Sequence, residues 1–169
     1  MLVIRATQKL LAKLGAPATY PPSSTTTLGD WYAKPFGVAQ RRFVLLISEK
    51  SRLAVLMPGR DVSALPRNFP GALEVQLERL GVPQDAIDRE VAACGDYVVA
   101  ATASKSLLGT LNDYAYMAQH RLRDQPHVDL EDESFSLSHT PLSPLGFQYA
   151  ADVALGLFGI ESHRGRMPF

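Results

Sequence analysis

Two segments of the chain share one pattern of residues that could bind an anion. VIRATQKLLAKL (3–14) and VVAATASKSLLGTL (98–111) each hold an apolar run, a threonine, a lysine and paired leucines. Each apolar run predicts a strand, and each leucine-rich part predicts a helix that follows it. If both strands lie in one sheet and run parallel, both helices begin at the same edge of the sheet, where free N–H groups favour an anion. The expected ligands are Thr7, Lys9, Thr102, Ser104 and Lys105.

The second segment continues as a helix over 105–123 that adds two candidates, Asn112 and Asp113. Asn112 shares a stripe with Lys105, Gly109 and Tyr116, and Asp113 lies about 80° away. The apolar stripe that we expect to cover the sheet comprises Leu107, Leu111, Tyr114, Ala118 and Leu122.

Gly109 lies in the middle of this helix, where a glycine costs about 1 kcal/mol of helix stability relative to alanine. We predict that another segment, either the 15–30 loop or the C-terminal connector, packs closely against Gly109. A ligand lying along the same stripe is the alternative explanation.

Other motifs with known chemistry are absent from the sequence. A well-capped strand–threonine–helix junction explains the repeated pattern without a ligand. The chain has no glycine-rich phosphate or dinucleotide motif and no nucleophile elbow. Its histidines lack the spacing of a metal site. We therefore expect neither a metal nor a cofactor.

The charges are balanced over the chain but divided between its halves. Seventeen basic and seventeen acidic residues cancel, which argues against non-specific nucleic-acid binding. Residues 1–60 hold nine Lys/Arg and two Asp/Glu, a net charge of +7, and residues 61–169 hold eight and fifteen, a net charge of −7. A basic sheet region beside acidic helices explains this division, as does a basic surface for an acidic partner.

Composition predicts a soluble cytoplasmic protein. The 169 residues, 46% hydrophobic and 20% charged, suit one globular domain. Cys94, the single cysteine, cannot form an internal disulfide and is expected to be buried. The start of the chain lacks the apolar region of a signal peptide, and we find no run of about 18 apolar residues.

The order of predicted elements indicates an α+β fold with a mainly antiparallel sheet. Residues 31–38, 42–48 and 52–57 predict a three-strand meander whose second and third strands are central, joined by strands 2–6 and 97–101 in one sheet. Helices are expected at 8–14, 70–80, 84–94, 105–123 and 149–158, and 127–138 as a short helix or an acidic loop. We expect a single domain over 1–160 with a mobile loop at 16–28, a turn-rich connector at 140–146 and a flexible tail at 161–169.

Three segments of this chain resemble an uncharacterised bacterial domain-of-unknown-function family. They are VIRATQKLL (3–11), LGDWYA (28–33) and SLLGTLND (106–113), of which LGTLND is the most specific. The likeness extends to about Leu157 and implies the order of fold elements, but no activity. Where the family has a basic residue and a Thr-Asn pair before the helix, this chain has Ala101, Thr102 and Ala103, which weakens an anion site there.

These observations favour a non-enzymatic binding or regulatory module with a protein partner or an anionic small molecule. One alternative is a small enzyme that acts on a phosphate-bearing substrate at the edge near Thr7 and Lys105. A weaker alternative is a nucleic-acid-associated factor that uses the basic residues 1–60.

Overall fold

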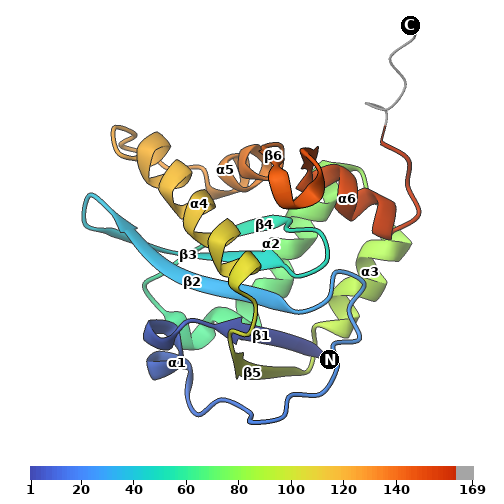
Figure 1. Cartoon of the computed structure of the whole chain (residues 1–169), viewed down its shortest axis with the longest axis horizontal. Helices are drawn as coiled ribbons and strands as arrows, with labels where there is room; N and C mark the ends of the chain where they lie inside the picture. The colour runs from blue at the N-terminus through green and yellow to red at the C-terminus, as the bar shows by residue number, and fades with distance from the viewer. Residues whose placement is uncertain (163–169) are drawn as a thin grey trace, which may run out of the picture.

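The predicted meander and its two added strands form one five-stranded sheet (Figure 1). The structure is a computed structural model, which describes residues 1–162. The strand order is β4-β3-β2-β1-β5. In chain order the strands are β1 (Leu2–Ala6), β2 (Trp31–Val38), β3 (Arg41–Ser48), β4 (Ala54–Pro58) and β5 (Tyr97–Ala101).

The sheet contains both antiparallel and parallel pairings. β2 pairs antiparallel with β3 over its whole length, and β3 pairs antiparallel with β4. β1 lies between β2 and β5 and runs parallel to both. The α+β class, the single sheet and the meander are therefore confirmed. The expectation that both apolar runs are central is wrong for the second run, because β4 is an edge strand.

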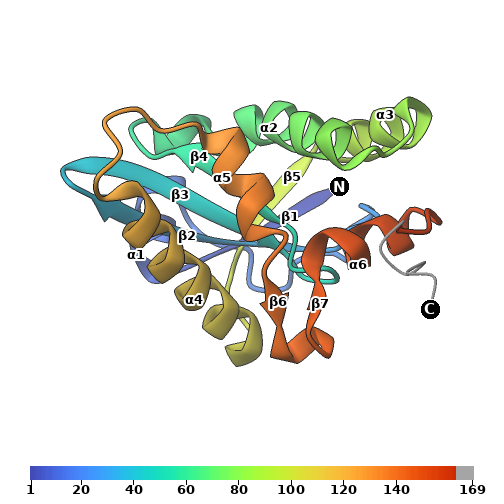
Figure 2. The ribbon, with the colours of Figure 1, turned by 90° about the horizontal axis from the view of Figure 1, so that it is seen from above.

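Helices cover both faces of the sheet, as seen from above in Figure 2. α1, α2 and α3 pack on the face that carries Ile4 and Trp31, and α4 and α5 pack on the face that carries Tyr32 and Leu45. Period-two alternation along the strands separates the two sets. The helices are α1 (Gln8–Leu14), α2 (Leu65–Leu80), α3 (Gln84–Ala93), α4 (Lys105–Leu122), α5 (Leu130–Leu137) and α6 (Ala150–Leu157).

The free edge of β4 is closed by side chains. The Ala54 N–H donates to Oγ of Ser138, the C-cap residue of α5, at 3.0 Å, and the Leu56 N–H donates to Oγ of Ser134 in α5 at 2.8 Å. On the α2 side, Gln76 Nε2 donates to the Ala54 carbonyl at 2.9 Å. Three outward backbone groups of β4, the Ala54 N–H, the Ala54 carbonyl and the Leu56 N–H, therefore have partners, which explains how an almost wholly apolar strand lies at an edge.

The segment between α1 and β2, expected to be a mobile loop over 16–28, is attached to the fold at several points. Ala18 N donates to the Val99 carbonyl of β5 at 2.8 Å. The amino group of Met1 donates to Thr25 Oγ1 at 2.6 Å. The buried Glu90 carboxylate of α3 accepts from Thr27 N and Leu28 N, at 2.8 and 3.1 Å. The mobility of this loop stays a prediction.

Three further segments of the structure differ from the expected helices and connector or define them more closely. α2 begins at Leu65 rather than near Pro70, which it contains as an internal proline. The 127–138 segment forms α5, because Asp129 accepts from Asp132 N as its N-cap. The connector contains a small hairpin of β6 (Pro141–Leu142) and β7 (Gln148–Tyr149) around the 3₁₀ turn η2 (Ser143–Leu145). Most of the expected tail, 163–169, lies outside the described residues.

The apolar stripe of α4 faces the sheet as predicted, but the expected packing against Gly109 is wrong. Leu107, Leu111 and Tyr114 are buried against the β2–β3 face. A Cβ added to Gly109 would meet no atom of a neighbouring segment within 4 Å. The 15–30 loop lies against β5, β1 and α3, and the connector pairs with itself as β6–β7, so neither covers this stripe.

Gly109→Ala should therefore raise the free energy of unfolding by about 1 kcal/mol, since alanine is the better helix former and has room. Gly81→Ala is the matched control, because its added Cβ also meets open space while its φ of +84° suits glycine. That control should lose about 1 kcal/mol. Urea denaturation of both variants measures the difference. A Gly109→Ala protein less stable than the parent would restore the packing explanation.

Candidate functional site

The strands of the predicted anion site are arranged as expected. β1 and β5 are parallel neighbours with Ala6 opposite Ala101, so Thr7 and Thr102 follow them at the same edge of the sheet. The helices then separate. α1 packs its Leu10 on the Ile4 face, whereas α4 packs its Leu107 on the opposite face. The structure therefore does not bring Lys9 and Lys105 together, because the sheet lies between the two helices.

Thr7 itself is part of the junction rather than an open ligand. Its N–H donates to the Ala33 carbonyl at 3.1 Å, and its carbonyl accepts from the N–H groups of Leu10 and Leu11. Its Oγ1 is buried, makes no cap hydrogen bond and has no partner within residues 1–162. Thr7 is thus the N-cap residue of α1, but its hydroxyl makes no cap hydrogen bond to the first turn of the helix.

The start of α4 is already partly satisfied by the chain. Ser104 is its N-cap, and Ser104 Oγ accepts from Leu107 N at 3.2 Å. Burial raises the pKa of Tyr32, and the Arg5 guanidinium opposes that rise. Thr102 is half-buried, and Lys105 is exposed to solvent.

Asn112 has a charged partner that the sequence did not indicate. Lys34 Nζ of β2 donates to Asn112 Oδ1 at 2.5 Å. Lys34 follows Tyr32 on the alternate positions of β2, so it points toward α4. The alternation of side chains along β2 is the sequence signal that could have placed Lys34 on the same face as α4. Asp113 is exposed, and among residues 1–162 its carboxylate makes no ion pair.

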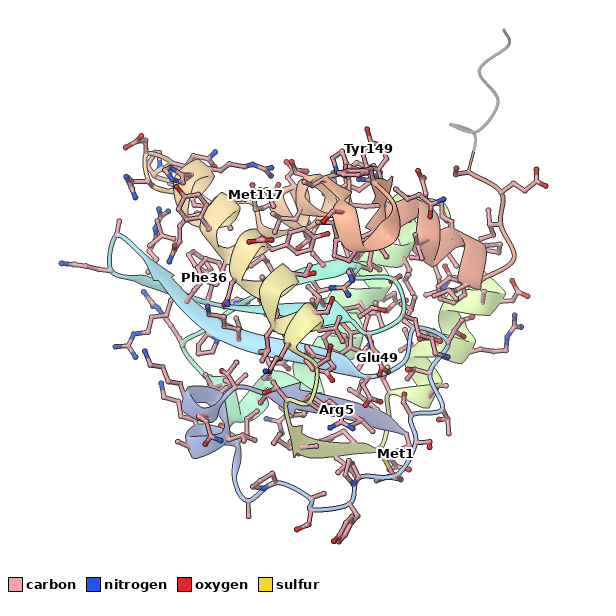
Figure 3. All side chains as sticks on the ribbon, in the orientation of Figure 1. Met1, Arg5, Phe36, Glu49, Met117 and Tyr149 are labelled. Carbon is pink, nitrogen blue, oxygen red and sulfur yellow. The ribbon has the colours of Figure 1, made fainter. Side chains whose placement is uncertain are left out.

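The three segments that carry the family resemblance meet on the α4 face of the sheet. Arg5 Nε of the first segment and Asp30 Oδ2 of the second form an ion pair at 2.7 Å. Lys34, directly after the second segment, reaches Asn112 of the third. Figure 3 labels Arg5 of this ion pair and the neighbouring Glu49. Glu49 Oε2 accepts from Asp30 N at 3.2 Å, so the ion pair lies in a polar cluster.

A basic groove lies on the other face, between α1 and the hairpin of β2 and β3. Its volume is about 390 Å³, and its cations are Lys9 and Lys13 of α1 and Arg42 of β3. The rest of its lining is Leu10, Pro35, Phe36, Gly37, Phe43, Gly59 and Val62. The groove thus combines an apolar floor with a positive rim, and no carboxylate lines it.

The three cations of this groove are unpaired. None of them forms an ion pair with any residue in 1–162, and all three are exposed. Lys9 and Lys13 are four residues apart on α1, so helical spacing places them on the same side. This i, i+4 pair was visible in the sequence. The sequence does not connect Arg42 with these two lysines. Arg42 comes to the groove through the register of β2 and β3, which places Arg42 opposite Gly37.

Gly59 is one reason why the groove is open at the end of β4. A Cβ at this position would lie 2.8 Å from Arg42 C and 2.8 Å from Phe43 N. The Gly59 N–H also donates to the Arg42 carbonyl at 2.9 Å. Close approach of the two backbones therefore holds Arg42 in place, and any larger residue at position 59 would push the chain away from β3.

The chain is a member of a defined protein family. Residues 3–153 match the family model of a domain of unknown function, DUF6933, so the chain belongs to that family. No curated protein matches the chain. No solved structure matches it either.

Metal clusters and membrane-spanning helices are both absent from the part of the chain that the structure describes. Within residues 1–162, no group of three or more His, Cys, Asp or Glu side chains could hold a metal ion. Over the same range, no helix is both long and apolar enough to cross a bilayer.

Proposed function

We propose that the protein is a binding module for a small organic anion, and that the anion binds in the basic groove beside α1. The observation that carries this proposal is the set of three unpaired cations over an apolar floor. Cations with no carboxylate among them attract an anion, and the apolar floor favours a ligand with a hydrophobic body. A volume of about 390 Å³ fits small-molecule pockets, which span roughly 300–1,000 Å³.

This proposal keeps the predicted binding role and moves the site. Lys9 is the one predicted residue that lines the groove. An enzyme site at the edge near Thr7 and Lys105 is less well supported, because the two lysines of that hypothesis lie on opposite faces. We also propose a cytoplasmic location, which the single buried thiol of Cys94 supports. Burial raises the pKa of that thiol to about 12, so it is unreactive at neutral pH.

The proposal is tested with 2-naphthalenesulfonate and with 2-naphthol as its uncharged counterpart. We expect the sulfonate to bind, and the Lys9→Gln/Lys13→Gln/Arg42→Gln variant to bind it roughly tenfold more weakly, about 1.4 kcal/mol. All three side chains are exposed, so the variant should fold normally. Isothermal titration calorimetry measures the affinity, and added salt should weaken it by screening.

The matched control removes the same charge elsewhere, in a Lys50→Gln/Lys105→Gln/Arg123→Gln variant. These side chains are also exposed and lie outside the groove. The control should keep the parent affinity. Equal weakening in both variants would show that net charge rather than the groove attracts the anion. Equal affinity for naphthol and the sulfonate would also contradict the proposal.

A further inference from the structure

A second cavity, independent of the basic groove, lies at the closed edge of the sheet. Its volume is about 180 Å³, and residues of β4, α2 and α5 line it. Figure 2 shows β4 between α2 and α5. Its walls are mostly apolar and include Val55, Met57, Ala72, Val75 and Leu130. For comparison, an apolar cavity of about 150 Å³ in another protein binds benzene.

Gln76 lines this cavity and has an unpartnered hydrogen-bond acceptor. Its side chain is 97% buried, with 3% of its surface exposed. Gln76 Nε2 donates to the Ala54 carbonyl at 2.9 Å and to Ser138 Oγ at 3.1 Å. A carbonyl can only accept, so the amide nitrogen must lie on that side. Gln76 Oε1 is left without a partner among residues 1–162, and Gln76 lines the cavity.

The other polar groups of the cavity limit the ligand further. The Ser134 hydroxyl is already used, since it donates to the Leu130 carbonyl at 2.6 Å and accepts from Leu56 N. Glu131 also lines the cavity and brings a carboxylate. The groups left for a ligand, Gln76 Oε1 and the Glu131 carboxylate, are acceptors. They favour a hydrogen-bond donor and disfavour an anion.

We infer that this cavity is a binding site for a small, single-ring apolar molecule that carries one hydroxyl or N–H donor. The ring fills the space between β4, α2 and α5, and the donor satisfies Gln76 Oε1. The cavity is expected to bind a neutral molecule, whereas the basic groove is expected to bind an anion. The two sites can therefore be tested separately.

The test is an NMR titration of the full chain with phenol, toluene and benzoate. Phenol and toluene have nearly the same shape and differ in the donor. We expect phenol to shift the Gln76 side-chain amide and the backbone amides of Ala72 and Val75, with a dissociation constant on the order of 1 mM. Toluene should bind at least tenfold more weakly, and benzoate should leave these signals unchanged.

Ala72→Leu adds bulk to the cavity wall and keeps Gln76 in the chain. It should weaken phenol binding at least tenfold, and the remaining spectrum shows that the variant is folded; Ala72→Met serves the same purpose if it is not. Three results would overturn the inference: equal affinity for phenol and toluene, phenol shifts that survive Ala72→Leu in a folded protein, or no shift at these residues at 20-fold excess over the expected constant, roughly 20 mM.

Discussion

Replacing Glu90 by alanine is expected to lower the free energy of unfolding by roughly 3–5 kcal/mol. Glu90 is 2% exposed, and its two carboxylate oxygens accept from Thr27 N and Leu28 N. The substitution removes both hydrogen bonds and leaves two N–H groups without their acceptor. It also detaches the 15–30 segment from α3, at the point where that segment leads into β2.

Urea denaturation measures the loss, and amide exchange at Thr27 and Leu28 locates it. Glu78→Ala is the matched control, since Glu78 is exposed and makes no side-chain hydrogen bond or ion pair within residues 1–162. The control should change stability by less than about 0.5 kcal/mol. Glu90→Gln should fall between the two, because an amide offers one acceptor. A loss below about 1 kcal/mol in Glu90→Ala would contradict the proposed anchoring role.

The Ser134→Ala/Ser138→Ala variant should lose roughly 3–5 kcal/mol, because several buried donors lose their acceptors together. Ser138 Oγ accepts from Ala54 N and from Gln76 Nε2, and Ser134 Oγ accepts from Leu56 N. Both serines are almost fully buried.

Ser136→Ala tests whether position in α5 alone matters. Ser136 lies between the two serines, is exposed and accepts from the Arg121 guanidinium at 2.9 Å. Its replacement should cost less than about 1 kcal/mol. Denaturation gives the difference, and amide exchange should speed up at Ala54 and Leu56 only in the double variant. Comparable losses in both proteins would disprove the role assigned to the buried serines.

The fold was largely predictable because its strongest signals are local. The runs FVLLIS and LAVLM are too short and too apolar for anything but strands, and the stripe from Leu107 to Leu122 has helical spacing. The closing of β4 was not predictable, because it depends on serines about eighty residues further along the chain. A strand in the middle of a sheet and an edge strand covered by other segments both have a continuous run of apolar residues, so the sequence does not distinguish them.

The candidate site was predictable in part. The anion-site hypothesis required β1 and β5 to run parallel in one sheet, and the structure meets this condition. It did not determine which face each helix covers, since that depends on where Leu10 and Leu107 find apolar partners. The groove cations were separated in the sequence by about thirty residues, and Arg42 joins Lys9 and Lys13 only through tertiary structure. The packing predicted against Gly109 was wrong because the sequence gives the free-energy cost of a glycine in a helix but not which atoms surround it.

The closed β4 edge limits how many copies of this protein could associate through their sheets. A β-sheet can extend from one molecule to the next only where unpaired backbone groups are available. β5 is the other edge of the five-stranded sheet, and its Val99 carbonyl is already taken by Ala18. Two copies joined through β5 would present a β4 strand at each outer end, where Ser134 and Ser138 already occupy the donors. Association by this route would therefore stop at a pair.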